Sequence, residues 1–298
     1  GRIAEILDAP VEADGGSAGP ALTGRIELRG LTFRYVDDRE PALKDIDLVI
    51  EPGWKVAFVG RTGSGKSALM QLLLRLYPAP EGTVFLDGRE IRTIPLAELR
   101  ASIGSVTQDI FLWSDKIREN IGFGSVRGAD DAAIRQAAEI SRLSTDIERF
   151  PDGYDQEIGE RGITLSGGQK QRTAIARAVV RDPAILILDD ALSSVDSHTE
   201  EEILSRLREY RKGRTTLVVT HRLSAIADAD LIVVVEEGRI VERGRHADLI
   251  AKGGAYARMW ESQRLVAELE ETQTEVPLSP GGPVVPAVSD APDSGPPE

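Results

Sequence analysis

The sequence predicts an α/β fold in which a parallel β-sheet is covered by helices on both faces. Three patterns predict it. Apolar runs of strand length alternate with helical stretches, as strands buried on both faces do; the runs are 56–59, 184–188, 215–219 and 231–235. Alternation with period two over 26–50 predicts an antiparallel β subdomain before the sheet. A mostly helical stretch over about 110–180 predicts a helical insert that interrupts the sheet.

The composition excludes several classes of protein. The 298 residues are 41% hydrophobic and 29% charged, close to ordinary globular proteins, and no run approaches the ~18 apolar residues of a membrane helix. The formal net charge of −13 has the wrong sign for a protein that neutralises phosphate backbones, so we expect no nucleic-acid partner. The chain has no cysteine, which excludes disulfides, thiolate catalysis and Cys-ligated zinc.

The first residues have a composition of their own. The apolar spacing of 2–7 is that of a helix, and Pro10 ends it. A loop rich in Gly, Ser, Ala and Pro follows. We interpret residues 1–23 as the end of a linker that continues from a preceding segment.

The last residues are acidic and rich in proline. After Arg264 the chain has no basic residue but seven acidic ones, together with seven of its sixteen prolines. Such a segment has too few apolar side chains to bury a core. We therefore expect the folded domain over 24–265 and a disordered tail over 266–298.

A glycine-rich loop joins the strand at 56–59 to a helix. It matches the pattern G-x-x-x-x-G-K-[ST] in full, as Gly60-Arg61-Thr62-Gly63-Ser64-Gly65-Lys66-Ser67. The glycines let successive backbone N–H groups curl around phosphates, Lys66 reaches the β- and γ-phosphates, and Ser67 binds Mg²⁺. The sequence thus predicts a P-loop NTPase (RecA-like) core that binds a nucleoside triphosphate with Mg²⁺.

Two aspartates follow the apolar strand at 184–188. A carboxylate at this place can approach the Mg²⁺ at the carboxyl edge of the sheet, so Asp189 is expected to be a metal ligand beside Ser67. Ser166-Gly167-Gly168 opens a predicted helix over 170–180, whose free N–H groups make an anion site.

Several segments resemble the motifs of one family, the ABC ATPases. Residues 165–172 resemble the family's signature, and 193–196 resemble its D-loop. Gln108 resembles the glutamine of the Q-loop, and His221 resembles the switch histidine. Tyr35 lies where the family stacks an aromatic ring on adenine. Taken singly, each residue is more often structural than functional. Their order around the P-loop is the family order, and the resemblance spans about 24–262.

The resemblance implies a composite ATP site. In the family, ATP is sandwiched between the P-loop of one domain and the signature of another. It implies catalytic roles for Asp190, His221 and Gln108, metal binding by Ser67, Gln108 and Asp189, and nucleotide contacts from Tyr35, the P-loop, Ser166, Gly167, Gly168, Gln169 and Asp196. A single chain then holds half of each site and needs a second domain as its partner.

Other motifs resemble the multidrug and lipid exporters within the family. They are Phe111-Leu112-Trp113-Ser114, 117–121 and Gly159-Glu160-Arg161-Gly162. In those exporters the ATPase domain is fused behind a six-helix membrane domain at the cytoplasmic face of the membrane, and 1–23 resembles the connecting segment. Importer ATPase subunits are the nearest alternative. Repair and chromosome ATPases carry long coiled coils inside the domain, for which 109–164 is too short.

One position departs from the family pattern. Active members carry a glutamate directly after the Mg²⁺-binding aspartate, where this chain has Asp190. The carboxylate is one methylene shorter, ~1.5 Å, and a misplacement of that order can cost ~100-fold in rate. We interpret Asp190 as the mark of a degenerate site in a heterodimeric exporter. The alternatives are a homodimer with two slow sites and an ATP-dependent clamp that hardly turns over.

Overall fold

The computed structural model describes residues 16, 18–36, 38, 40–125, 128–159, 165–210 and 212–274, of which 197, 198, 267 and 270–274 are described as backbone alone. Most of the predicted linker and tail therefore lies outside the described residues. The part of 1–23 that is described packs on the domain: Leu22 is buried, and Thr23 donates from its backbone and hydroxyl to Asp87 at 2.6 Å each.

The main sheet has six strands in the order β10-β9-β3-β8-β7-β6. The strands are β3 (Lys55–Val59), β6 (Ile103–Val106), β7 (Ile185–Asp189), β8 (Thr215–Val219), β9 (Leu231–Glu236) and β10 (Arg239–Gly244). All neighbours are parallel except β9 and β10, which are antiparallel. The predicted parallel sheet is confirmed. The sequence patterns missed β6, which is short, and β10, an edge strand without fully buried residues.

The predicted antiparallel subdomain is a separate four-stranded sheet in the order β2-β1-β4-β5. Its strands are β1 (Ile26–Phe33), β2 (Leu43–Ile50), β4 (Val84–Leu86) and β5 (Arg89–Glu90). β1 pairs with β2 and with β4, in a register that sets Ile26 opposite both Ile50 and Leu86. This subdomain carries Tyr35 directly after β1.

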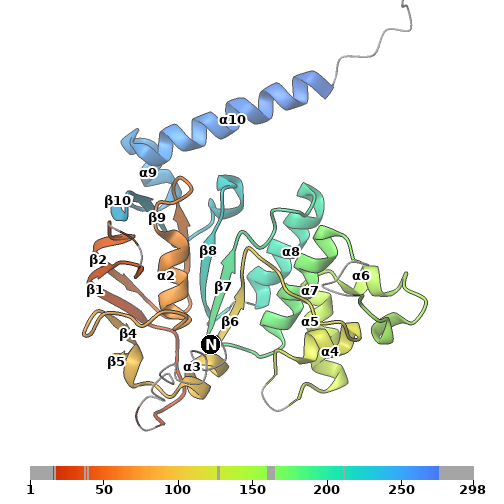
Figure 1. Ribbon diagram of the computed structural model, residues 1–298. Coiled ribbons are helices and arrows are strands. Elements are labelled where there is room, and N and C mark those ends of the chain that lie inside the picture. The colour runs from red at the N-terminus through yellow and green to blue at the C-terminus, as the bar shows by residue number, and fades with distance from the viewer. Residues whose placement is uncertain are drawn as a thin grey trace, which may run out of the picture.

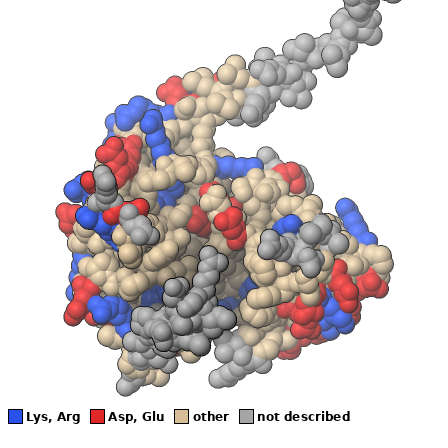
Figure 2. All heavy atoms as spheres, viewed as in Figure 1, with Lys and Arg blue, Asp and Glu red and all other residues tan. Residues whose placement is uncertain are grey.

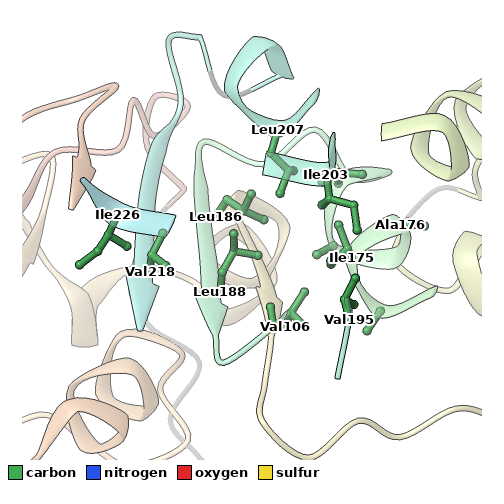
Figure 3. Packing of buried hydrophobic residues seen from close by; sticks show 14 of the residues in the cluster. Val106, Ile175, Ala176, Leu186, Leu188, Val195, Ile203, Leu207, Val218 and Ile226 are labelled. Atoms are coloured by element: carbon green, nitrogen blue, oxygen red, sulfur yellow. The ribbon is translucent and has the colours of Figure 1, made fainter. Parts of the chain in front are cut away.

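Alternate side chains of the main sheet enter two different cores, as strands buried on both faces require. Val56 and Phe58 of β3 pack with α2 (Lys66–Leu73) and the antiparallel sheet. Ala57 and Val59 belong to the other core, with α7 (Gly167–Val179) and α8 (Ser197–Tyr210), part of which Figure 3 shows. The P-loop helix and the signature helix therefore pack on opposite faces of one sheet.

The predicted helical insert is confirmed between β6 and β7 (Figure 1). It consists of α4 (Ile117–Gly122), α5 (Asp131–Ile140), α6 (Ser144–Ile147), the 3₁₀ turn η2 (Gly153–Asp155) and α7. The remaining short helices are η1 (Ile91–Thr93), α3 (Leu96–Ser102), η4 (Leu223–Ile226) and α9 (His246–Lys252). Figure 2 shows basic and acidic side chains interspersed over the face seen there.

The last described element is the long helix α10 (Ala255–Thr274), which extends away from the body of the molecule (Figure 1). The prediction of a disordered tail from 266 is wrong over 266–274, because the helix-breaking prolines begin only at Pro277. Leu265, Val266 and Leu269 of this helix are exposed. Within the described residues, no helix is both long and apolar enough to cross a membrane.

Candidate active site

The glycine loop lies between β3 and α2, as its sequence predicts, and two of its glycines are sterically required. A Cβ at Gly60 would lie 2.1 Å from the carbonyl oxygen of Val235, and one at Gly65 would lie 2.5 Å from that of Ala42. Both glycines also have positive φ, a conformation that L side chains rarely adopt. At Gly63 an added Cβ would meet nothing within 4 Å. The two ends of the loop, at Gly60 and Gly65, are thus closely packed, whereas its middle at Gly63 is open.

The Lys66 ammonium is enclosed by this loop. Its side chain is among the buried polar groups, with 6% of the residue exposed. Nζ donates to the carbonyl oxygens of Gly60 at 2.8 Å and Arg61 at 2.9 Å. Burial lowers the pKa of Lys66, against the opposing effect of the carboxylates of Asp190 and Asp189. A desolvated cation inside a ring of backbone dipoles is well suited to bind phosphate oxygens.

The two predicted metal ligands on α2 and β7 lie together. The Ser67 side chain hydrogen-bonds the carboxylate of Asp189, a buried group whose pKa is raised by burial and by the neighbouring Asp190. A hydroxyl and a carboxylate are hard oxygen donors of the kind Mg²⁺ prefers, and Mg²⁺ commonly takes further ligands from phosphates. The residues therefore fit Mg²⁺. Gln108, after β6, is exposed and makes no polar contact with this pair among the described residues, so its metal role stays a prediction.

Asp190 and His221 meet beyond the carboxyl ends of β7 and β8. His221 Nε2 lies 3.5 Å from Asp190 Oδ2. The backbone N–H of Asp190 donates to Val219 at 2.9 Å, and Asp190 has φ +47°, a left-handed conformation in which aspartate is enriched. The Asp190 side chain is nearly buried, whereas 55% of the His221 side chain is exposed. The structure thus brings two of the three predicted catalytic residues together near the P-loop lysine, whereas the catalytic role of Gln108 stays a prediction.

The signature forms the start of α7. Ser166 is the N-cap: its hydroxyl accepts from the Gln169 N–H at 3.2 Å, and the Gln169 side chain accepts from the Ser166 N–H at 3.0 Å. Gln169 also donates to Asp146 of α6 at 3.2 Å, and Asp146 pairs with Arg172 at 2.7 Å. The predicted anion site at this helix start is therefore fixed on two sides.

The signature helix is also bonded to the loop after β7. Gln171 donates to the Ser193 hydroxyl at 2.9 Å and accepts from the Ser194 N–H at 2.9 Å. A Cβ at Gly167 would lie 3.2 Å from the Ser194 side chain, so the two segments are in close contact. Asp196, at the end of this loop, accepts from the Thr199 N–H at 2.9 Å and caps α8. No pattern in the sequence indicates this role of Gln171.

Tyr35 lies beside the P-loop helix. Its hydroxyl donates to Gln71 of α2 at 2.7 Å. Its ring makes edge contacts with Phe33 and Tyr77, each at a centroid distance of 5.0 Å. Burial raises the pKa of its hydroxyl. The side chain is half-buried, so an aromatic surface remains next to the phosphate-binding loop, where adenine is expected to stack.

An aromatic groove lies in the helical insert, with a volume of about 930 Å³. It is lined by Phe111, Leu112, Trp113, Ser114, Asp115, Glu119, Gly122 and Phe123. Phe111, Trp113 and Phe123 are exposed and contact one another through Trp113, with centroid distances of 4.8 Å and 5.3 Å. Large apolar side chains exposed in a group mark an interaction site.

Asn120 and Arg177 hold the floor of the aromatic groove. Asn120 is fully buried and makes two hydrogen bonds with the Trp113 backbone, at 2.9 and 3.0 Å. Arg177, in the last turn of α7, donates to the carbonyl oxygens of Phe111 at 2.7 Å and Asn120 at 2.8 Å. Burial lowers the pKa of Arg177 to about 10. Sequence reasoning missed Arg177, because an arginine inside a helix carries no pattern of its own, whereas Asn120 lies in the exporter-like motif at 117–121.

The fold and the site define a P-loop nucleoside triphosphatase domain. It has a Ser/Asp pair that fits Mg²⁺, a second anion-binding helix start on the opposite face of the sheet and an inserted helical unit. Residues 43–193 match the family described as ABC transporter. The chain belongs to the ABC transporter family.

Individual relatives place the chain among ATPase domains of the exporter type. An ATP-dependent lipid A-core flippase of Hahella chejuensis is 48% identical over 258 residues, covering 86% of this chain and 44% of the relative. ATP-binding cassette sub-family B member 6 of Xenopus tropicalis is 44% identical, covering 89% and 31%. A bacterial Atm1-family ABC exporter with ATP bound has a TM-score of 0.82 at 39% identity, covering 88% and 47%. The chain thus spans less than half the length of these proteins.

Proposed function

We propose that this chain binds ATP and Mg²⁺ and hydrolyses ATP at an interface with a second ABC domain, and that this cycle drives export through a membrane domain. The observation that carries the proposal is that α2 and α7 pack on opposite faces of the main sheet. The P-loop and the signature are therefore two separate anion sites within one chain. A second domain that brings its own signature to this P-loop, and the reverse, would complete two sites.

Each group in the P-loop half has a defined task in this proposal. Lys66 binds phosphate oxygens, and Ser67 and Asp189 bind Mg²⁺, which neutralises phosphate charge when bound. His221 and Asp190 lie 3.5 Å apart, close enough for one to orient the other or a water molecule between them and the phosphate. The Ser166 hydroxyl donates a hydrogen bond in the partner's site, since its oxygen already accepts one from the Gln169 N–H.

We further propose that the P-loop site of this chain is degenerate and that the partner is a different half-transporter. The shorter carboxylate of Asp190 supports this, because its backbone N–H is bonded to Val219 and leaves little freedom to bring the side chain forward. The capping box of Ser166 and Gln169 is complete, as a signature that serves a competent partner site requires. A homodimer with two slow sites and an ATP-dependent clamp are the alternatives.

ATPase rate against protein concentration distinguishes these alternatives. For the lone chain we expect turnover to stay near background over a hundredfold range of concentration, about 100-fold below that of the assembled pair. Addition of the partner domain should restore turnover. A steep rise with the concentration of the lone chain would show a homodimeric enzyme instead. If turnover is absent even with the partner present, the remaining alternative is the ATP-dependent clamp.

We propose that the aromatic groove seats a cytoplasmic segment of the membrane domain, with the chain at the cytoplasmic face of the membrane. The groove is large, its aromatic side chains are exposed, and Asp115 and Glu119 add negative charge to its lining. These features fit a short helix with one apolar face and a basic residue. These relatives are more than twice as long as the region that matches, which supports the presence of a membrane domain.

Truncation of Trp113 tests the groove. In the full-length protein, Trp113→Ala should leave MgATP affinity within twofold but reduce transport per ATP hydrolysed by about tenfold or more, the scale of losing an aromatic anchor. Val49→Ala removes an exposed apolar side chain from β2, outside the groove, and is the matched control. Equal loss of transport in both variants, or full transport in Trp113→Ala, would contradict a docking role.

A further inference from the structure

His221 lies in the loop after β8, and a side chain of α10 hydrogen-bonds the backbone of this loop. Gln263 of α10 accepts from the Leu223 N–H at 3.0 Å and donates through its Nε2 to the carbonyl oxygen of His221. One side-chain amide thus hydrogen-bonds the carbonyl group that precedes Arg222 and the N–H group that follows it. Such a two-point contact fixes the direction of a peptide segment more firmly than a single bond would.

The surroundings of this contact place it next to the reacting groups. A cavity of about 210 Å³ separates α10 from the P-loop, and Gly60, His221, Met259 and Gln263 line it. The His221 side chain is mostly exposed, and among the described residues its one ion-pair partner is Asp190. Packing around the imidazole therefore contributes little to its orientation, which depends on the backbone that carries it.

The rest of the loop is held from the other direction. Arg222 pairs with Glu200 of α8 and donates to the Val195 carbonyl oxygen at 3.4 Å. Its N–H donates to the Thr220 hydroxyl at 3.0 Å. The side-chain bonds tie Arg222 to α8 and to the loop after β7, whereas Gln263 ties the peptides of His221 and Leu223 to α10.

We infer that Gln263 is a positioning residue for ATP hydrolysis: it sets the imidazole of His221 relative to Asp190 through the His221 and Leu223 backbone. The inference rests on the proposed hydrolytic role of His221. It goes beyond that role, because it makes the helix that follows the ATPase motifs part of the hydrolytic machinery. A shift of α10 would then change the rate of hydrolysis without touching the phosphate-binding loop.

The first measurement needs no nucleotide. Gln263→Met keeps the length of the side chain and removes both polar groups, so amide exchange at Leu223 should speed up by on the order of tenfold. In Gln263→Glu the carboxylate still accepts from the Leu223 N–H but no longer donates to His221, so exchange at Leu223 should stay slow. Ser262→Ala, which lines the same cavity, should leave exchange unchanged.

The second measurement is turnover at the P-loop site of this chain, in the full-length protein assembled with a partner whose own P-loop site is disabled. Gln263→Met and Gln263→Glu should each lower kcat by about tenfold while the KM for MgATP stays within twofold, because the phosphate-binding groups are unmoved. A kcat loss shared by both variants separates the bond to His221 from the bond to Leu223. Ser262→Ala should keep the parent kcat.

A double-mutant cycle decides whether Gln263 acts through His221. In a His221→Ala background, Gln263→Met should lower kcat no further. An equal loss in both backgrounds would overturn the inference, since Gln263 would then act elsewhere, and so would a KM that rises with the fall in kcat. If His221→Ala keeps full turnover while exchange at Leu223 still speeds up in Gln263→Met, the hydrolytic role of His221 fails and the positioning role fails with it, although the contact is real.

Discussion

Lys66→Ala should abolish MgATP binding in a titration with a fluorescent ATP analogue. The ammonium is buried in the glycine loop, where it donates to two backbone carbonyl oxygens 2.8 and 2.9 Å away, and we expect it to bind phosphate oxygens there. Its loss removes charge-assisted hydrogen bonds of about 1.5 to 3 kcal/mol each, so two such bonds correspond to a fall in affinity of at least ~100-fold. Unchanged affinity would mean that the loop does not bind the nucleotide.

Two controls separate binding from folding in this experiment. Burial lowers the pKa of Lys66 in the folded chain, so the charged form is held at a cost to folding at neutral pH. Lys66→Met, which keeps the length without the charge, should therefore bind no MgATP and yet not lower the thermal midpoint in the absence of nucleotide. Lys212→Ala removes an equal charge from an exposed position and should leave affinity unchanged.

In the proposed heterodimer, Asp190→Asn should leave steady-state turnover within a few-fold, because the partner's site would carry most of the flux. Replacing the glutamate after the Mg²⁺-binding aspartate of the partner by glutamine should lower turnover by ~100-fold or more, the scale of losing a positioned general base. Steady-state phosphate release from matched preparations gives both values. If Asp190→Asn alone stops turnover and the partner variant stays active, Asp190 is a working base and the degenerate-site proposal is wrong.

Asp190→Glu is the reciprocal variant. If only reach is missing, the longer carboxylate should raise hydrolysis at this site, measured as single turnover with the partner's site disabled. The backbone adds a counter-effect, because Asp190 has φ +47°, a region in which aspartate is enriched over most residues other than glycine. We therefore expect a gain in rate together with a small loss of thermal stability. A loss of rate would show that the site lacks more than length.

The sequence predicted most of the site because motif chemistry and strand periodicity are both local. The glycine loop, the strand that ends at Asp189 and the capped start of α7 at Ser166 are each encoded by a few consecutive residues, and the structure has these local elements as expected. The elements that were missed depend on contacts between distant segments. β10 is a strand because it pairs with β9, and Gln171 is important because Ser193 and Ser194 fold against it.

The boundary of the tail shows the limit of composition as a guide. Charge and proline content change after Arg264, yet a helix can continue through acidic residues until a proline stops it, and α10 runs to Thr274. An exposed glutamine such as Gln263, in the last turns of a domain, has no pattern that marks it, and only the fold reveals that it meets His221.

The bond between Arg177 and the aromatic groove has a directional consequence. Arg177 and Ser166 lie at the two ends of α7, whose thirteen residues span about 20 Å. If α7 moves as a rigid body, a displacement of the groove by a bound membrane segment would be transmitted along the helix to the signature at its other end. That signature belongs to the nucleotide bound by the neighbouring chain in the proposed dimer. Each membrane half would therefore act first on the ATP held by the opposite half.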